Sequence, residues 1–132
     1  MVPESYRYTE EHEWLRVGDD GTISLGVTAF AQNELGEVVY VELPSVGDAV
    51  TAGDPIGSIE SVKAVAEIYS PIGGEIAAVN SSLDDAPEQV NDAPHDDGWL
   101  VRIKPDDDAQ SVLDGLMDAT AYRRHIAGAD DA

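Results

Sequence analysis

The residue whose type and setting best suit chemistry is Lys63, one of two lysines in a chain that also carries 27 acidic residues. It lies within residues 57–67, where a small polar turn separates two apolar runs typical of strands. A lysine in such a turn points its amine into water, and a deprotonated lysine amine can form an amide. The pattern indicates either a lysine that is modified and presented to other proteins or a solubilising lysine at a hairpin tip.

Glycines interrupt the chain on both sides of this turn. Gly47 precedes Lys63 and Gly74 follows it, and we expect each to occupy a turn in which the missing Cβ permits a positive φ. If the strands that flank the lysine run antiparallel, Lys63 lies at one pole of the domain. A group attached there would extend outward from a scaffold that the neighbouring hairpins hold in place.

The other polar residues form no recognisable catalytic or metal-binding pattern. His12, His95 and His125 lack the i, i+4 spacing of helical metal ligands, so we interpret them as surface or core histidines. The acidic run 106–108 lacks the alternating ligands and central glycine of a calcium loop. No nucleophile elbow, phosphate-binding loop or dinucleotide fingerprint is present, and there is no cysteine. Sulfur redox chemistry would therefore have to come from a cofactor, and we expect no enzyme activity from the chain's own side chains.

The charge of the chain narrows its partners and its setting. Seven basic and 27 acidic residues give a formal net charge of −20 and a pI near 4.1, which argues against nucleic acid or an anionic membrane as partner. Apolar periodicity persists between the acidic clusters, so we expect a folded protein of a high-salt cytoplasm rather than a disordered chain. The first residues lack the blocks of a signal peptide, and no apolar run approaches the roughly 18 residues that span a bilayer.

Two alternating stretches and a capped helix are expected to open the fold. Residues 13–17 and 22–27 predict a hairpin around a turn at 18–21. The side chains expected to face inward from this hairpin are Leu15, Val17, Ile23, Leu25 and Val27. Thr28 is expected to cap a short helix that reaches Leu35, buries Phe30 and Leu35 and stops at Gly36.

The rest of the chain predicts further short strands followed by helices. Strands are expected at 37–43, 49–50, 75–79 and 99–104. Two more are expected around Lys63: one that ends at Glu60 and one that follows the lysine turn and ends at Tyr69. The last of these strands is expected to place Trp99, Val101 and Ile103 on one face. We expect a loop with at most one helical turn over residues 80–97 and helical structure beyond Pro105. This spacing predicts one mainly β domain over residues 1–132: a β-sandwich or barrel over 8–104, a helical segment over 105–127 and an acidic tail over 128–132.

Five segments of the chain together resemble one family of carrier proteins. They are residues 8–14 (YTEEHEW), 26–32 (GVTAFAQ), 35–44 (LGEVVYVELP), 60–64 (ESVKA) and 98–105 (GWLVRIKP). In this order and spacing they resemble the H proteins of the glycine cleavage system, which carry a lipoyl group on a lysine. The resemblance extends over about a hundred residues, from Tyr8 to Lys104. It favours the modified-lysine interpretation of Lys63 over the solubilising one.

The resemblance implies a flattened β-sandwich of the biotinyl/lipoyl type, with a short inserted helix and C-terminal helices. It implies lipoic acid in amide linkage to Lys63, within a recognition hairpin that contains Glu60, Ser61, Val62 and Ala64. The implied role is a shuttle that takes an aminomethyl group from a pyridoxal-phosphate glycine decarboxylase to a tetrahydrofolate-dependent aminomethyltransferase and is reoxidised by dihydrolipoamide dehydrogenase. A lipoate-attaching enzyme is a further implied partner, and we expect a monomer.

The resemblance also suggests a pocket for the loaded arm, because the aminomethyl group ends in a cationic amine. A carrier should hold that cation with acidic side chains and exclude water from it. The positions that match the family's pocket acids are Glu13 and Glu67, although the family more often has aspartate at the second. The alternative interpretation is that both are ordinary surface acids.

Two other functions fit parts of the pattern. One is a lipoyl or biotinyl module of another complex, such as a 2-oxoacid dehydrogenase; such modules are usually shorter and tethered by flexible linkers. The other is an unmodified interaction protein or lipoate relay of the same fold. If salt screens the acidic surface, we expect docking to rely on Val62, Ala64 and Val65 around the lysine.

Overall fold

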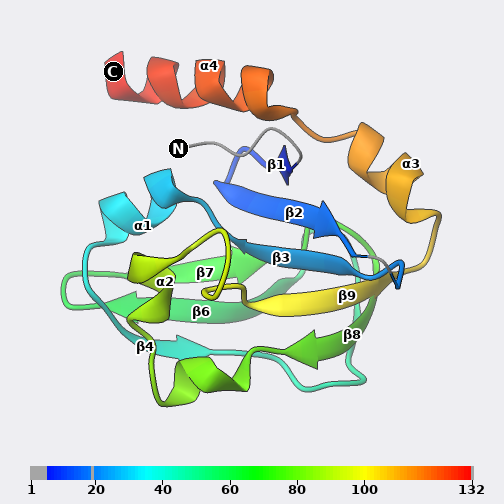
Figure 1. The fold of residues 1–132 in the computed structure, drawn as a ribbon, viewed down its shortest axis with the longest axis horizontal. Helices are drawn as coiled ribbons and strands as arrows, with labels where there is room; N and C mark the ends of the chain where they lie inside the picture. Colours follow the sequence, from blue (N-terminus) through cyan, green and yellow to red (C-terminus); the bar gives the residue numbers. More distant parts are fainter. Residues whose placement is uncertain (1–5, 19, 132) are drawn as a thin grey trace.

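The computed structural model describes residues 6–18 and 20–131, which form two antiparallel sheets with short helices around them (Figure 1). One sheet has six strands in the order β1-β2-β3-β9-β8-β5, and the other has three in the order β4-β6-β7. Residues 1–5, Asp19 of the expected first turn and Ala132 of the expected tail lie outside the described residues. The strands are β1 Arg7–Tyr8, β2 Glu13–Val17, β3 Ile23–Val27, β4 Val38–Glu42, β5 Ala49–Val50, β6 Pro55–Ser61, β7 Val65–Tyr69, β8 Gly74–Val79 and β9 Val101–Pro105.

The helices are short apart from the last. They are α1 Ala29–Leu35, the 3-10 helix η1 Ser81–Asp84, α2 Gln89–Asp92, α3 Ala109–Asp114 and α4 Ala119–Asp131. The side chain of Thr28 caps α1 by accepting a hydrogen bond from the Ala31 amide, and Gly36 ends the helix with φ of 80°. Within the described residues, no helix is both long and apolar enough to cross a bilayer.

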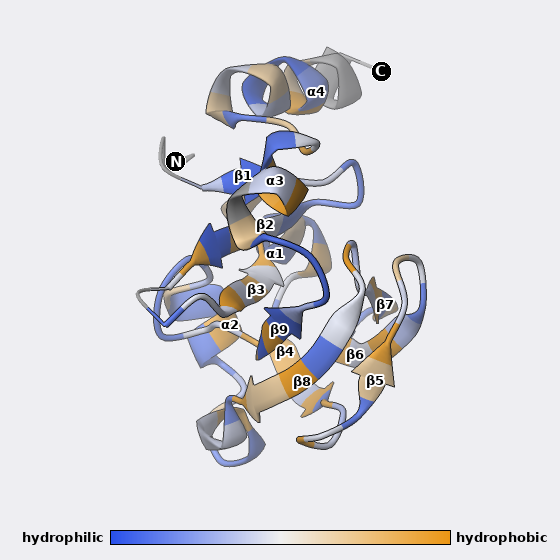
Figure 2. Cartoon of the chain, turned by 90° about the vertical axis from the view of Figure 1, so that its right-hand side faces the viewer, coloured by the Kyte–Doolittle hydropathy of each residue, from blue (hydrophilic) through white to orange (hydrophobic). Residues whose placement is uncertain are grey.

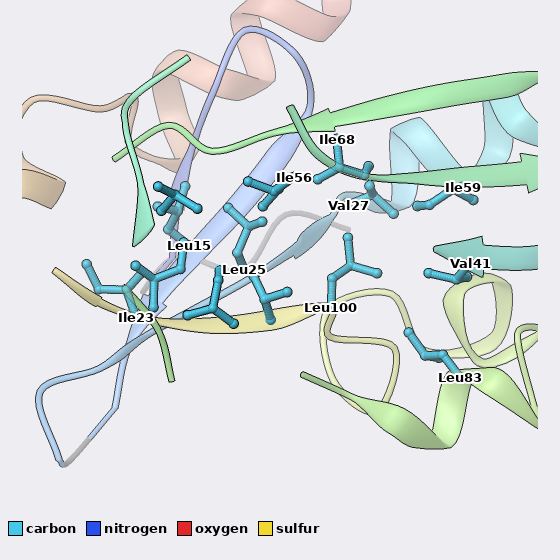
Figure 3. Close-up of a cluster of buried hydrophobic side chains, with 14 of the residues drawn as sticks. Leu15, Ile23, Leu25, Val27, Val41, Ile56, Ile59, Ile68, Leu83 and Leu100 are labelled. Atoms are coloured by element: carbon cyan, nitrogen blue, oxygen red, sulfur yellow. The ribbon is translucent and has the colours of Figure 1, made fainter. Parts of the chain in front are cut away.

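The two sheets pack face to face around an aliphatic core. Leu15 and Leu25 of the large sheet point toward Ile56, Ile59 and Ile68 of the small one (Figure 3). Hydrophobic residues are concentrated in strands such as β4, β5 and β8 (Figure 2). This packing confirms the predicted mainly β, two-sheet architecture.

A second, aromatic cluster attaches the C-terminal helix to the large sheet. Tyr8, Trp14, Ala119 and Tyr122 are buried in it, and the rings of Tyr8 and Tyr122 stack with centroids 4.6 Å apart. The bridge between Tyr8 and Met117 ties the start of the chain to the segment before α4. These contacts place α4 along the edge of the sheet near β1 (Figure 1).

Four predicted side-chain placements need correction. Val17 is 36% exposed because it ends β2 next to the turn, where the sheet stops. Phe30 and Leu35 are only half-buried, since α1 buries no side chain fully and lies over a groove. Trp99 precedes β9 and packs against the aromatic cluster, while Leu100 takes the place in the aliphatic core.

The predicted boundaries after β8 also need correction. Residues 80–97 contain two helical segments, η1 and α2, rather than at most one turn. The helical pattern beyond Pro105 divides into α3 and α4, and α4 continues to Asp131, so residues 128–131 belong to a helix and not to a tail. A glycine inside a helix costs only about 1 kcal/mol relative to alanine, so Gly128 does not have to end it.

Candidate functional site

Lys63 lies at the exposed tip of the hairpin that joins β6 and β7, which run antiparallel as expected. The Ser61 amide donates to the Ala64 carbonyl at 2.8 Å, and the Ser61 hydroxyl accepts hydrogen bonds from the amides of Lys63 and Ala64 at 3.3 and 3.1 Å. The Val62 amide donates to the carbonyl of Glu37, next to β4, at 3.0 Å. The lysine therefore stands on a turn that bonds both to itself and to the neighbouring chain.

The stem of the lysine passes close to the end of α1. A Cβ built on Gly36 would lie 3.5 Å from Cε of Lys63, and the φ of Gly36 is in the left-handed region that favours glycine. The positive φ therefore explains the glycine at this C-cap, because a Cβ would make only an ordinary van der Waals contact with the lysine stem. The contact places the hairpin tip beside α1, whose side chains form one wall of a groove.

The glycines expected at turns have different roles. Gly47 has a φ of 95°, which confirms its prediction. Gly74 does not occupy a turn: it begins β8 and pairs with Pro105 and Val50. A Cβ there would lie 2.2 Å from the carbonyl oxygen of Lys104, so this position requires glycine because two strands approach closely.

A groove of about 440 Å³ lies between α1, β7 and the segment that leads into β2. Much of its lining is apolar, and it also contains four carboxylates, three of them exposed and one buried. Both predicted pocket acids, Glu13 and Glu67, line it. The complete lining is Glu11, His12, Glu13, Val27, Phe30, Ala31, Glu34, Leu35, Ala66, Glu67 and Ile68.

Glu13 is almost completely buried, with 3% of its surface exposed, although it is a carboxylate. Its Oε2 accepts a hydrogen bond from the Tyr69 amide at 3.0 Å, and its Oε1 accepts one from the Thr9 hydroxyl at 3.2 Å. Burial raises the pKa of Glu13 to about 7, and the bonds from Tyr69 and Thr9 oppose that rise. This carboxyl group therefore changes charge near neutral pH.

Glu67 occupies a more open position at the edge of the groove. It is exposed, and the strand register places it in one row with Ser58 of β6 and Glu42 of β4. The same three residues line a second hollow of about 500 Å³, whose other lining residues come from β5, β6 and the segments between β4 and β6. The structure thus places Glu67 at the rim of the groove that Glu13 lines, and Glu67 also lines the second hollow.

His12 and Phe30 form a wall of the groove that the sequence did not predict. His12 has a φ of 68°, and its ring lies 4.7 Å from that of Phe30. Its Nδ1 hydrogen-bonds at 2.9 Å to the hydroxyl of Tyr122, which in turn bonds to the Thr28 hydroxyl at 2.7 Å. Burial lowers the pKa of His12, with the nearby His125 acting in the same direction. Within the described residues, no three side chains gather as metal ligands.

The residues of the predicted recognition hairpin divide into two groups. Glu60, Val62 and Ala64 are exposed, as is Val65 on the far side of the turn. Val62 and Val65 expose 68% and 64% of their surface, so apolar groups surround the lysine. Ser61 is buried, and its hydroxyl is used inside the turn, so it shapes the hairpin instead of facing a partner.

Comparison with known proteins finds the same likeness over the whole chain. A family model described as Glycine cleavage H-protein matches residues 6–128. A glycine cleavage system H protein from Teredinibacter turnerae is 51% identical over 120 residues, which cover 91% of each chain. One from Chromohalobacter salexigens is 48% identical over 130 residues, covering 98% of each chain. The solved structure of a glycine cleavage system H protein from Mycobacterium marinum matches with a TM-score of 0.84 at 32% identity, covering 99% of this chain and 100% of that one.

Proposed function

The chain belongs to the glycine cleavage H-protein family, and on that premise we propose that it carries lipoic acid in amide linkage to Lys63. Its fold is the lipoyl-type sandwich of that family, and its role is that of the lipoyl shuttle of the glycine cleavage system. The observation that supports Lys63 is its place: an exposed hairpin tip beside α1, whose side chains line a groove that contains four carboxylates.

The residues around Lys63 suit a long acyl arm. When bound, the lipoyl group supplies the pair of sulfur atoms that accept and release an aminomethyl group. Ser61 fixes the turn, and the lysine stem passes next to Gly36 at the end of α1. β7 extends from the hairpin to Tyr69 and is about 13 Å long at the usual rise per residue. The amide of Tyr69 donates a hydrogen bond to Glu13. An acylated lysine that folds back along this strand can therefore reach the buried carboxylate.

Glu13 is proposed to hold the cationic amine at the end of the loaded arm. Its carboxylate is buried, fixed by two hydrogen bonds and titrates near pH 7, so a cation that enters the groove favours its charged form. The apolar part of the lining restricts the access of water. Glu67 is proposed as a second acid at the rim.

The proposed partners are those of the glycine cleavage system: glycine decarboxylase, aminomethyltransferase and dihydrolipoamide dehydrogenase, together with a lipoate-attaching enzyme. Glu60, Val62 and Ala64 are the exposed hairpin residues that these enzymes would meet next to the lysine. We propose that the chain acts in the cytoplasm as a monomeric carrier and contributes no catalytic side chain of its own.

Intact mass tests the attachment directly. The chain is produced in a host that makes lipoate, and we expect a single lipoyl increment that maps to the peptide containing Lys63. Lys104→Arg is the matched control, because it changes the only other lysine, which is also exposed. We expect Lys104→Arg to keep the increment and Lys63→Arg to lose it. An increment that survives in Lys63→Arg would disprove the assignment.

A further inference from the structure

Three neighbouring strands of the six-stranded sheet place two arginines in one row. Arg16 of β2 pairs with Ser24 of β3, and Ser24 pairs with Arg102 of β9. The adjacent residues Leu15 and Leu25 point into the aliphatic core, so the row lies on the opposite face of the sheet. Strands lie about 4.8 Å apart, which separates the two arginine Cα atoms by about 10 Å.

Hydroxyl groups and aromatic rings contact both guanidinium groups. Arg16 donates from Nη1 to the Tyr6 hydroxyl at 3.1 Å and lies 5.5 Å from the centre of that ring. Arg102 donates from Nε to the Ser24 hydroxyl at 3.3 Å and lies 4.1 Å from the centre of the Trp99 ring. Both cations thus contact hydroxyls and aromatic faces. Arg102 also interacts with one acid: hydrogen bonds from Thr22 lower the pKa of Asp20, and the charge of Arg102 acts in the same direction.

The row forms one side of a hollow of about 340 Å³. The lining consists of Arg16, Gly18, Asp20, Thr22, Ser24 and Arg102. The one carboxylate in this lining, that of Asp20, accepts hydrogen bonds from the amide and hydroxyl of Thr22 at 3.0 and 2.7 Å. It is therefore tied to the turn that it belongs to, and two positive charges share the hollow with one negative charge.

The two arginines that line the hollow determine which class of ligand it suits. Guanidinium presents parallel N–H donors that match the oxygen atoms of phosphate and carboxylate groups. Arg16 and Arg102 both line the hollow, so one oxyanion that enters it can accept hydrogen bonds from both. The Ser24 hydroxyl accepts from Arg102 and still has its own proton to donate. We propose that this hollow binds one small oxyanion of the phosphate or carboxylate class between Arg16 and Arg102.

Most residues that line the hollow belong to the β2–β3 turn or flank it. This turn lies at the opposite end of the molecule from the β6–β7 hairpin (Figure 1). An oxyanion bound there would leave Lys63 and its groove accessible. The proposal therefore stands apart from the lipoyl function: either can fail without the other.

The test is a titration of ¹⁵N-labelled chain with sodium phosphate at pH 7 and constant sodium chloride, followed by amide chemical shifts. We expect saturable shifts around Ser24 and Arg102 with a dissociation constant on the order of 1 mM. Arg16→Gln and Arg102→Gln should each weaken binding about tenfold, because each removes charge-assisted hydrogen bonds. A parallel titration with sodium acetate distinguishes a phosphate site from a carboxylate site.

Two further variants separate binding from packing. Asp20→Asn removes the competing charge from an exposed turn while keeping an oxygen for Thr22, and it should tighten phosphate binding several-fold. Arg124→Gln, an exposed arginine of α4, is the matched control and should bind as the wild type does. Equal affinities in the wild type, Arg102→Gln and Asp20→Asn would overturn the proposal and leave the two arginines a packing role only.

Discussion

The burial of Glu13 predicts that Glu13→Gln stabilises the folded protein and that the gain grows with pH. The folded pKa of this carboxyl group is about 7, against an ordinary value of 4.5, because burial disfavours the charged form. Between these two pH values the folded chain holds a proton that the unfolded chain has released. The contribution of Glu13 to the free energy of unfolding therefore falls as pH rises from 4.5 to 7.

The size of the stability difference between wild type and Glu13→Gln follows from the change in the pKa of Glu13 on folding. One pKa unit corresponds to 1.36 kcal/mol, so the rise of Glu13 from 4.5 to about 7 corresponds to a loss of about 3 kcal/mol. Glutamine avoids this loss because it is neutral at every pH. Its amide oxygen can accept from the Tyr69 amide, and its NH₂ can donate to the Thr9 hydroxyl, so below pH 4.5 the two proteins should have similar stability.

The assay is urea unfolding of wild type and Glu13→Gln from pH 4 to pH 8 at one salt concentration. The difference between the two free energies of unfolding should grow by about 3 kcal/mol over this range. Glu67→Gln is the matched control, since it removes the same charge from an exposed position in the same groove, and its effect should stay within about 0.5 kcal/mol. A difference for Glu13→Gln that stays constant from pH 4 to pH 8 would refute the reasoning.

Three further predictions concern the arm, the sheet and the hairpin. Glu13→Gln should speed the loss of ammonia and formaldehyde from the loaded carrier, measured by product release without partner enzymes; an unchanged rate would contradict the role of Glu13 as holder of the cation. Gly74→Ala should lower the free energy of unfolding by about 3 kcal/mol or more, because the added Cβ would lie 2.2 Å from the Lys104 carbonyl oxygen. A loss below about 0.5 kcal/mol in urea unfolding would contradict this close approach. Val62→Ser with Val65→Ser should raise the KM of glycine decarboxylase for the carrier at high salt with little change in unfolding, since both side chains are exposed; an unchanged KM would exclude them from docking.

The sequence predicted well those elements that depend on residues close together in the chain. The alternation of 13–17 and 22–27 predicted the first hairpin, and Thr28 and Gly36 correctly marked the limits of α1. The same local pattern placed Lys63 in a turn between antiparallel strands. In each case the signal is a period or a cap, which neighbouring residues set by themselves.

Features that depend on distant contacts could not be predicted in the same way. The burial of Glu13 depends on Tyr69, 56 positions away, and the placement of His12 depends on Tyr122, 110 positions away. Gly74 looks like a turn glycine in the sequence, and only the approach of Lys104 from β9 reveals its role. The resemblance to a family indicated Glu13, but the physical property that suits it to a cation, a buried carboxyl group with a raised pKa, became visible only in the fold.

The most direct test of the lipoyl shuttle on Lys63 is the exchange of label between glycine and bicarbonate by glycine decarboxylase. Lipoylated wild type and Lys104→Arg should support exchange at equal rates, because both keep the lysine at the hairpin tip. Lys63→Arg should support none, since it offers no amine for the lipoyl group. Full exchange with Lys63→Arg would contradict the account.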